Sequence, residues 1–179
     1  MRDLPHLDAV LAEHAAVLGA DLARYRHHCL RVAHFALALA AERGDDAEAR
    51  EKVALDAVFH DIGIWTDGTF DYLEPSVRVA LAYLARIGRA AWSDEIAAMI
   101  REHHKLTPSR APSAWLVEPF RKADWIDVTR GLIAHGVSRR VRADVFARWP
   151  ALGFRWRLVQ LTLRRLRTHP LRPLPMLRR

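Results

Sequence analysis

The sequence predicts an all-α protein with a single domain, and three observations support this prediction. Apolar residues recur at steps of three and four through most of the chain. Glycines and prolines close these periodic stretches, and no stretch alternates apolar and polar residues as a strand would. With 179 residues, the chain is long enough to bury one sizeable core. We therefore expect a single bundle of about six to eight helices.

The helices can be placed in order along the chain. The first strong helix spans residues 24–44, and one face of it carries Tyr25, His28, Val32, Phe35 and Leu39. The next spans residues 45–63, where acids at the start suit the positive end of the helix dipole and a glycine closes the helix. Further helices are expected over residues 74–89, 93–108, 113–136, 138–150 and 154–169, before a proline-rich extended segment at 170–179.

Cysteine content and hydropathy exclude several classes of protein. The chain has one cysteine, Cys29, so it cannot form a disulfide within itself. Its first residues carry acids early and lack the apolar core of a signal peptide. No window approaches the roughly 18 apolar residues of a membrane span. These features predict a cytoplasmic location and no transmembrane helix.

The net charge of +7 is unevenly distributed. Residues 139–179 hold twelve arginines and one acid, Asp144, and so contribute +11, which leaves −4 for residues 1–138. We therefore divide the chain into a helical body, 1–138, and a basic helical extension, 139–179, that we expect to pack on the same domain. The arginines of helix 154–169 lie largely off its apolar stripe, so this helix can dock on its own domain, contact a membrane surface or pair in a homodimer.

Ligand-type side chains fall on the inward faces of four expected helices. His28 shares an apolar face, His60 and Asp61 close their helix, His103 follows an apolar stripe, and Asp124 lies among apolar neighbours. A buried carboxylate is costly unless it is paired or coordinated, and imidazole with carboxylate suits first-row divalent metals. Adjacent residues within a helix point about 100° apart, whereas at a helix end the chain can turn both toward one ion. The pattern predicts a metal site with the His60–Asp61 doublet at a helix terminus.

At this point the sequence resembles a known family. "HCLRV" from His28, "FHDIG" around His60 and Asp61, and "KAD" ending at Asp124 match the H…HD…D pattern of the HD-domain superfamily of metal-dependent phosphohydrolases, over roughly residues 20 to 130. The resemblance implies an HD-type helical bundle with His28, His60, Asp61 and Asp124 as ligands of a divalent metal ion: Mn, Mg, Fe, Co, Ni or Zn. Some members place an acid at the third position after the doublet, one position after its glycine, where this chain has Ile64, and no subfamily is identified.

Further residues are candidates for the chemistry around the metal. Asp67, His103 and His104 are candidates for proton transfer, and His103 or His104 could instead bind a second metal. Candidates for contacts with a phosphorylated substrate are Lys105, Arg110, Arg130 and Trp65, because cations hold phosphate and an indole can stack on a base. Asp127 is expected to pair with Arg130 or Arg31 rather than bind metal.

The sequence therefore predicts a metal-dependent phosphohydrolase that attacks a nucleotide or other small phosphate ester with a metal-activated water. Two alternatives stay open: a diiron oxygenase or lyase on the same scaffold, and a non-catalytic binding module stapled by its metal. Nucleic acid is not the expected partner. If the arginine-rich tail did bind it, binding would depend steeply on salt concentration.

Overall fold

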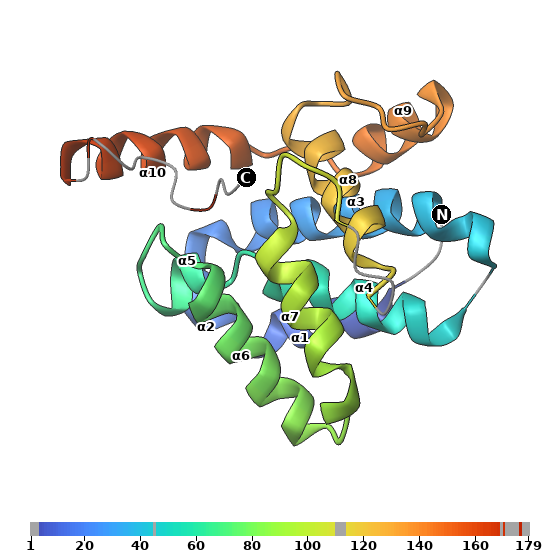
Figure 1. Ribbon diagram of the computed structural model, residues 1–179. Helices are drawn as coiled ribbons and strands as arrows, with labels where there is room; N and C mark the ends of the chain where they lie inside the picture. The colour runs from blue at the N-terminus through green and yellow to red at the C-terminus, as the bar shows by residue number, and fades with distance from the viewer. Residues whose placement is uncertain (1–3, 45, 110–113, 169, 171–175, 177–179) are drawn as a thin grey trace.

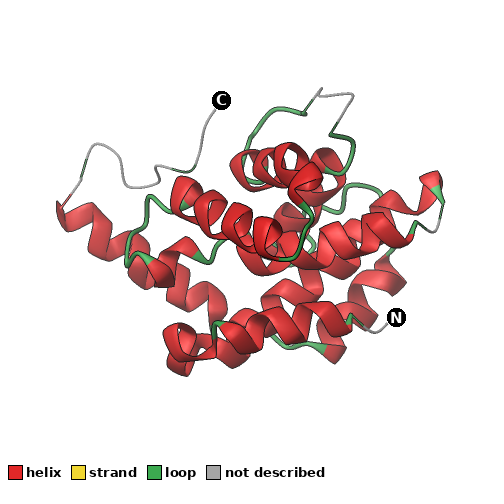
Figure 2. Cartoon of the chain, turned by 90° about the horizontal axis from the view of Figure 1, so that it is seen from below, coloured by secondary structure: helices red, strands yellow, loops and turns green. Residues whose placement is uncertain are grey.

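The computed structural model describes residues 4–44, 46–109, 114–168, 170 and 176, and within them every regular element is a helix (Figures 1 and 2). The α-helices are α1 (Pro5–Glu13), α2 (Ala15–Leu18), α3 (Leu22–Ala40), α4 (Ala47–Phe59), α5 (Gly63–Thr66), α6 (Leu73–Arg86), α7 (Ser93–Glu102), α8 (Val117–Val128), α9 (Arg139–Arg148) and α10 (Phe154–Thr168). Short 3-10 turns occupy Gly19–Asp21, Ala41–Arg43 and Ala90–Trp92. The all-α prediction is confirmed.

Helix α3 is the central element of the fold, because α1, α4, α8, α9 and α10 all contact it (Figure 1). Its predicted inward face is correct: Tyr25, His28, Val32 and Phe35 are fully buried. Helix α7 packs between α6 and α8 and also contacts α4. The C-terminal ends of α4 and α7 and the middle of α3 and α8 therefore meet in the interior. No helix in the described residues is long and apolar enough to cross a membrane.

Several helix ends differ from the sequence-based expectation, among them the end of α7, which is at Glu102 instead of residue 108, and those of α4 and α8. Helix α4 is capped at its start by the Asp46 carboxylate, which accepts from Glu48 N–H, but it ends at Phe59, and a turn separates it from α5. Helix α8 ends at Val128 instead of continuing to residue 136. Arg130 and Gly131 adopt positive φ, and the Gly131 N–H bonds back to the Ile126 carbonyl at 2.7 Å. This is the hydrogen bond of a left-handed helix ending, so the backbone cannot continue.

Gly63 allows the start of α6 to approach the turn that carries His60 and Asp61. Its N–H donates to Ser76 Oγ at 2.9 Å. A Cβ atom on Gly63 would lie 2.5 Å from the Tyr72 carbonyl oxygen and 2.9 Å from the Ser76 nitrogen. Because these are backbone atoms of a packed helix, they cannot move aside cheaply. The glycine after the doublet therefore has a packing role.

Gly63→Ala should destabilise the fold by about 1–3 kcal/mol, because it overpacks the contact between α5 and α6. Thermal unfolding measures this as a lower midpoint. Gly88→Ala is the matched control: its Cβ meets nothing within 4 Å, so only its positive φ of 71° opposes the change. A Gly63→Ala midpoint equal to that of the unsubstituted protein would contradict the close approach.

Candidate metal centre

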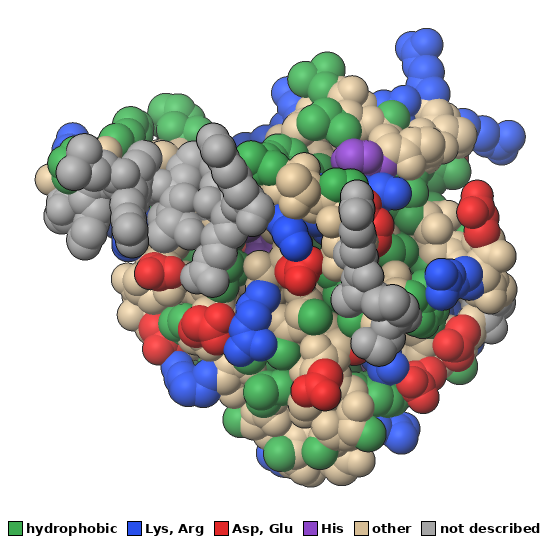
Figure 3. Space-filling view, viewed as in Figure 1, with side chains coloured by type: hydrophobic (Ala, Val, Ile, Leu, Met, Phe, Trp, Pro, Cys, Tyr) green, Lys and Arg blue, Asp and Glu red, His purple; other side chains and the backbone are tan. Residues whose placement is uncertain are grey.

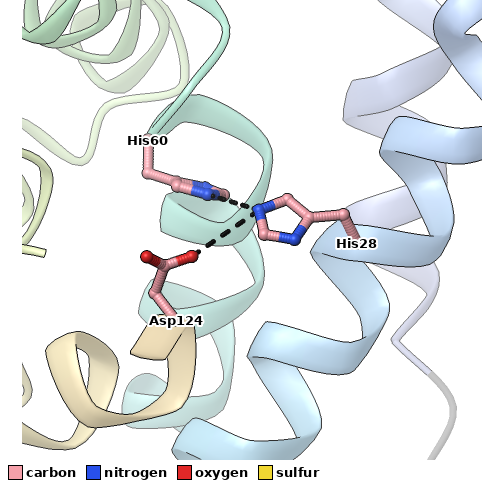
Figure 4. Close-up of side chains that lie close together, drawn as sticks. All are labelled: His28, His60 and Asp124. Atoms are coloured by element: carbon pink, nitrogen blue, oxygen red, sulfur yellow. Dashed lines mark hydrogen bonds and ion pairs between the residues drawn. The ribbon is translucent and has the colours of Figure 1, made fainter. Parts of the chain in front are cut away.

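His28 of α3, His60 after α4 and Asp124 of α8 point toward one another from three separate segments (Figure 4). The Nε2 atoms of the two histidines lie 2.9 Å apart, and Asp124 Oδ1 lies 3.7 Å from His28 Nε2. All three residues are at most 1% exposed. Such burial of polar groups demands partners for each of them.

Asp61, His103 and His104 extend the cluster. Asp61 Oδ2 lies 3.5 Å from His60 Nε2, and Asp61 Oδ1 lies 3.4 Å from His103 Nε2. His104 Nδ1 lies 3.3 Å from Asp124 Oδ2. Three overlapping groups each offer ligand atoms within 4.8 Å of one another: His28, His60 and Asp124; His60, Asp61 and His103; His103, His104 and Asp124. Atoms that bind one metal ion through bonds of about 2.1 Å lie at such distances from one another, so these donor atoms are arranged as the ligands of an ion would be.

The hydrogen bonds of the outer ring nitrogens determine which atoms face this centre. His28 Nδ1 meets the Asp127 carboxylate at 2.7 Å, and the Nδ1 atoms of His60 and His103 meet the carbonyls of Ala57 and Ile100 at 3.0 and 2.7 Å. An oxygen acceptor at Nδ1 requires the proton there, so each of these rings, in its neutral form, turns its Nε2 lone pair inward.

Two inward lone pairs 2.9 Å apart, on His28 and His60, need a cation between them. Within the described part of the chain, Asp61 Oδ1, His103 Nε2 and Asp124 Oδ2 are buried without a hydrogen-bond partner. Since such atoms are normally satisfied, the donor set fits a divalent metal ion with nitrogen and oxygen ligands. His28, His60, Asp61 and Asp124 would hold it, with His103 adjacent.

A buried ion pair orients His28 from behind. Asp127 accepts from Arg31 Nε at 2.5 Å and from a terminal nitrogen of Arg31 at 2.9 Å, while its Oδ2 also meets His28 Nδ1. Arg31 donates further to the Trp149 carbonyl at 3.0 Å, and it is fully buried. This confirms that Asp127 is an ion-pair partner of Arg31. A carboxylate in this position fixes the ring's tautomer and orientation.

The pKa values follow from burial and from charge. Burial lowers the pKa of His60 to about 3. Burial also lowers the pKa of His103, but the Asp61 and Asp124 carboxylates outweigh it and raise the value to about 8. Burial raises the pKa of Asp124 to about 7. For Asp61 the effect of burial is overcome by His60 and His103, which hold its pKa well below the usual value. The cluster therefore holds a charged carboxylate beside imidazoles.

His104 lies at the accessible edge of the cluster, where its side chain is 16% exposed. Its Nε2 lies 2.6 Å from the Tyr72 hydroxyl. Burial lowers the pKa of His104 well below its usual value, with His103 adding to the effect, and burial raises the pKa of Tyr72. A neutral imidazole and a neutral phenol are thus joined beside Asp124.

The other predicted residues are not all brought to this centre. Asp67 is placed in an exposed ion pair with Arg78, 2.7 Å away, so the geometry does not support it as the catalytic base. Trp65 donates to Asp21 Oδ2 at 3.0 Å and packs with its ring 4.5 Å from that of Tyr25, which makes it part of the core rather than a free stacking surface.

The cations expected to bind substrate lie at the periphery. Lys105 pairs with Glu102 at 3.5 Å, two residues after His103, and Arg130 is exposed in the turn after α8. Arg110 lies outside the described residues. Among these, Lys105 is nearest in sequence to the cluster, and no hydrogen bond within the described residues joins it to the ligands.

Two contacts at the site were not predicted. Tyr72 lies in the turn-rich stretch 66–72, but its partner His104 is 32 residues away. The Phe154 ring, at the start of α10, stacks on the His28 ring with centroids 4.2 Å apart and 19° between planes. The basic extension thus covers one face of a candidate ligand. An aromatic residue beginning an apolar stripe was the only sequence signal for this contact.

The fold and the site define a class: a helical domain with a buried His/Asp cluster suited to a divalent metal. Comparison with protein families agrees, since the model of the HD domain matches residues 25–130. The chain belongs to the HD domain family, whose superfamily is of the metal-dependent hydrolase type. No curated protein and no solved structure matches it significantly.

Proposed function

We propose that this protein is a metal-dependent phosphohydrolase acting on a nucleotide or another small phosphate ester. The observation that carries the proposal is the pair of inward lone pairs on His28 and His60, flanked by Asp61 and Asp124. That arrangement supports a resident divalent cation as the centre of the chemistry. The membership of the chain in the HD domain family supports hydrolysis as the reaction.

A divalent ion at this centre would supply Lewis acidity toward a phosphoryl oxygen and lower the pKa of a water molecule. The side chains supply position and proton transfer. Asp127 and Arg31 orient His28, and the Ala57 carbonyl orients His60. We assign proton transfer to His104, because it is neutral, lies at the accessible edge and is oriented by Tyr72. His103 groups with the ligands instead, since it is fully buried beside Asp61.

Metal analysis by mass spectrometry, followed by a nucleotide screen with Mn, Co and Mg, tests the proposal. The purified protein should carry about one equivalent of divalent metal, and Asp61→Ala should lose it, because it removes a charged ligand. His104→Gln should keep the metal and lose roughly a hundredfold in turnover, as expected for loss of a proton-transfer group. An absence of metal in all three proteins, even after metal is added back, would refute the site assignment.

Two other functions on this scaffold predict different results. The third ligand group, His103 with His104 and Asp124, offers donors for a second ion. Two irons per chain with oxygen uptake would favour an oxygenase or lyase. A tightly held metal with no turnover would favour a binding module, for which the apolar Ile64 after the doublet is the supporting feature.

A further inference from the structure

Helix α10 has two apolar faces, and only one of them packs on the protein. Phe154 is buried, and Leu158 and Leu161 pack against buried core residues. The opposite face exposes Trp156 (63%), Val159 (43%), Leu163 (52%) and Leu166 (39%). At about 100° per residue these four lie within an arc of roughly 80°, on the far side from the packed stripe.

The exposed row, defined as these four residues, lies on a helix that extends away from the body (Figure 1). Figure 3 shows hydrophobic side chains gathered along the outer edge of α10. Scattered apolar residues are normal on a surface, but a continuous row along a helix usually marks a contact with another phase or another molecule. The row therefore requires an occupant.

Charge decides which occupant fits. Helix α10 has five arginines and no acid. By helical geometry Arg164 and Arg167 flank the exposed row on one side, whereas Arg155 on the other side is partly buried with its Nε atom enclosed. Arg157 is already paired with Asp21 at 3.0 Å. The row is thus flanked by arginines and by no acid of its own helix.

A second copy of this chain is a poor occupant. Two α10 helices paired through their exposed rows would bring arginines together from both sides, and α10 offers no carboxylate to neutralise them. Like charges at close range destabilise such a pairing. An anionic lipid surface has the opposite charge and accepts an apolar row at the same time.

We propose that α10 is a membrane-surface helix that binds anionic phospholipid. The exposed row enters the boundary between headgroups and acyl chains, and the flanking arginines contact lipid phosphates. Trp156 suits this boundary, because indole side chains concentrate there, and arginine stems extend to keep their charge at the headgroups. The helix stays docked through Phe154, so the candidate metal centre would face a region near the membrane surface. This inference does not depend on the proposed activity.

Vesicle co-sedimentation of the full chain tests this proposal. The protein should bind vesicles of phosphatidylcholine mixed with phosphatidylserine. Added salt should weaken this binding steeply, and vesicles of phosphatidylcholine alone should bind the protein much more weakly. Trp156→Ala combined with Leu163→Ser should weaken binding about tenfold or more, since two apolar contacts with the bilayer are lost. Arg164→Gln with Arg167→Gln should weaken it less, and mainly at low salt.

Val17→Ser is the control, because Val17 is an exposed apolar residue on α2 (42%) and lies outside the row. It should leave vesicle binding unchanged, and circular dichroism should show that each variant keeps its helices. Failure of the unsubstituted protein to bind the anionic vesicles would overturn the proposal, as would equal binding by the Trp156/Leu163 variant. A dimer in solution that dissociates in that variant would also overturn it and assign the row to a second copy.

Discussion

Asp127→Ala should lower the free energy of unfolding by about 3–5 kcal/mol, the largest loss expected from one side chain in this protein. The substitution leaves the Arg31 guanidinium fully buried without its carboxylate, and it removes the acceptor of His28 Nδ1. Denaturant-induced unfolding of the metal-free protein measures the loss. Asp144→Ala, an exposed change on α9, is the control and should stay within about 0.5 kcal/mol.

The same substitution, Asp127→Ala, should also weaken metal binding by about 10- to 100-fold, because the His28 ring loses its orienting partner.

The loss of stability in Asp127→Ala should depend on pH. Burial opposes charge on Asp127, but His28 and Arg31 prevail and lower its pKa from 3.8 to about 2. A lowered pKa stabilises the fold above the unfolded value, and this contribution disappears as pH falls from about 4 through 2. A small loss in the free energy of unfolding of Asp127→Ala at neutral pH would contradict the buried ion pair between Asp127 and Arg31.

Removal of the metal by a chelator should lower the stability of the loaded protein by about 4 kcal/mol when free metal exceeds its Kd about a thousandfold. For a chain of this size the midpoint of thermal unfolding should fall by about 8–16 °C. The physical reason is the cluster itself: without a cation, the Nε2 lone pairs of His28 and His60 oppose each other in a buried site.

Asp61→Ala provides the comparison for this measurement. A variant that cannot hold the ion should show nearly the same midpoint with and without chelator, and adding metal back should restore only the unsubstituted protein. Equal midpoints for the unsubstituted protein, with and without chelator, would mean that the cluster is satisfied without an ion.

The four-residue set His28, His60, Asp61 and Asp124 illustrates what a sequence can predict about a site. Helical periodicity places His28 on a face with three fully buried neighbours. A polar group on a buried face needs a hydrogen-bonding or coordinating partner, so such groups are expected to lie together. The structure brings these residues together, as expected. Asp67 shows the limit of such reasoning. It follows the doublet closely in sequence, yet its side chain is turned toward solvent, where it pairs with Arg78.

The sequence by itself determined the helical class, the buried faces and the residues that converge, because periodicity and the cost of buried charge are local properties of the chain. Only the tertiary structure decided the contacts of Tyr72 with His104 and of Phe154 with His28, and the choice of Arg31 rather than Arg130 as the partner of Asp127. Their geometry depends on how α3, α8 and α10 pack, and a close packing of side chains is a property of the whole core rather than of any one helix.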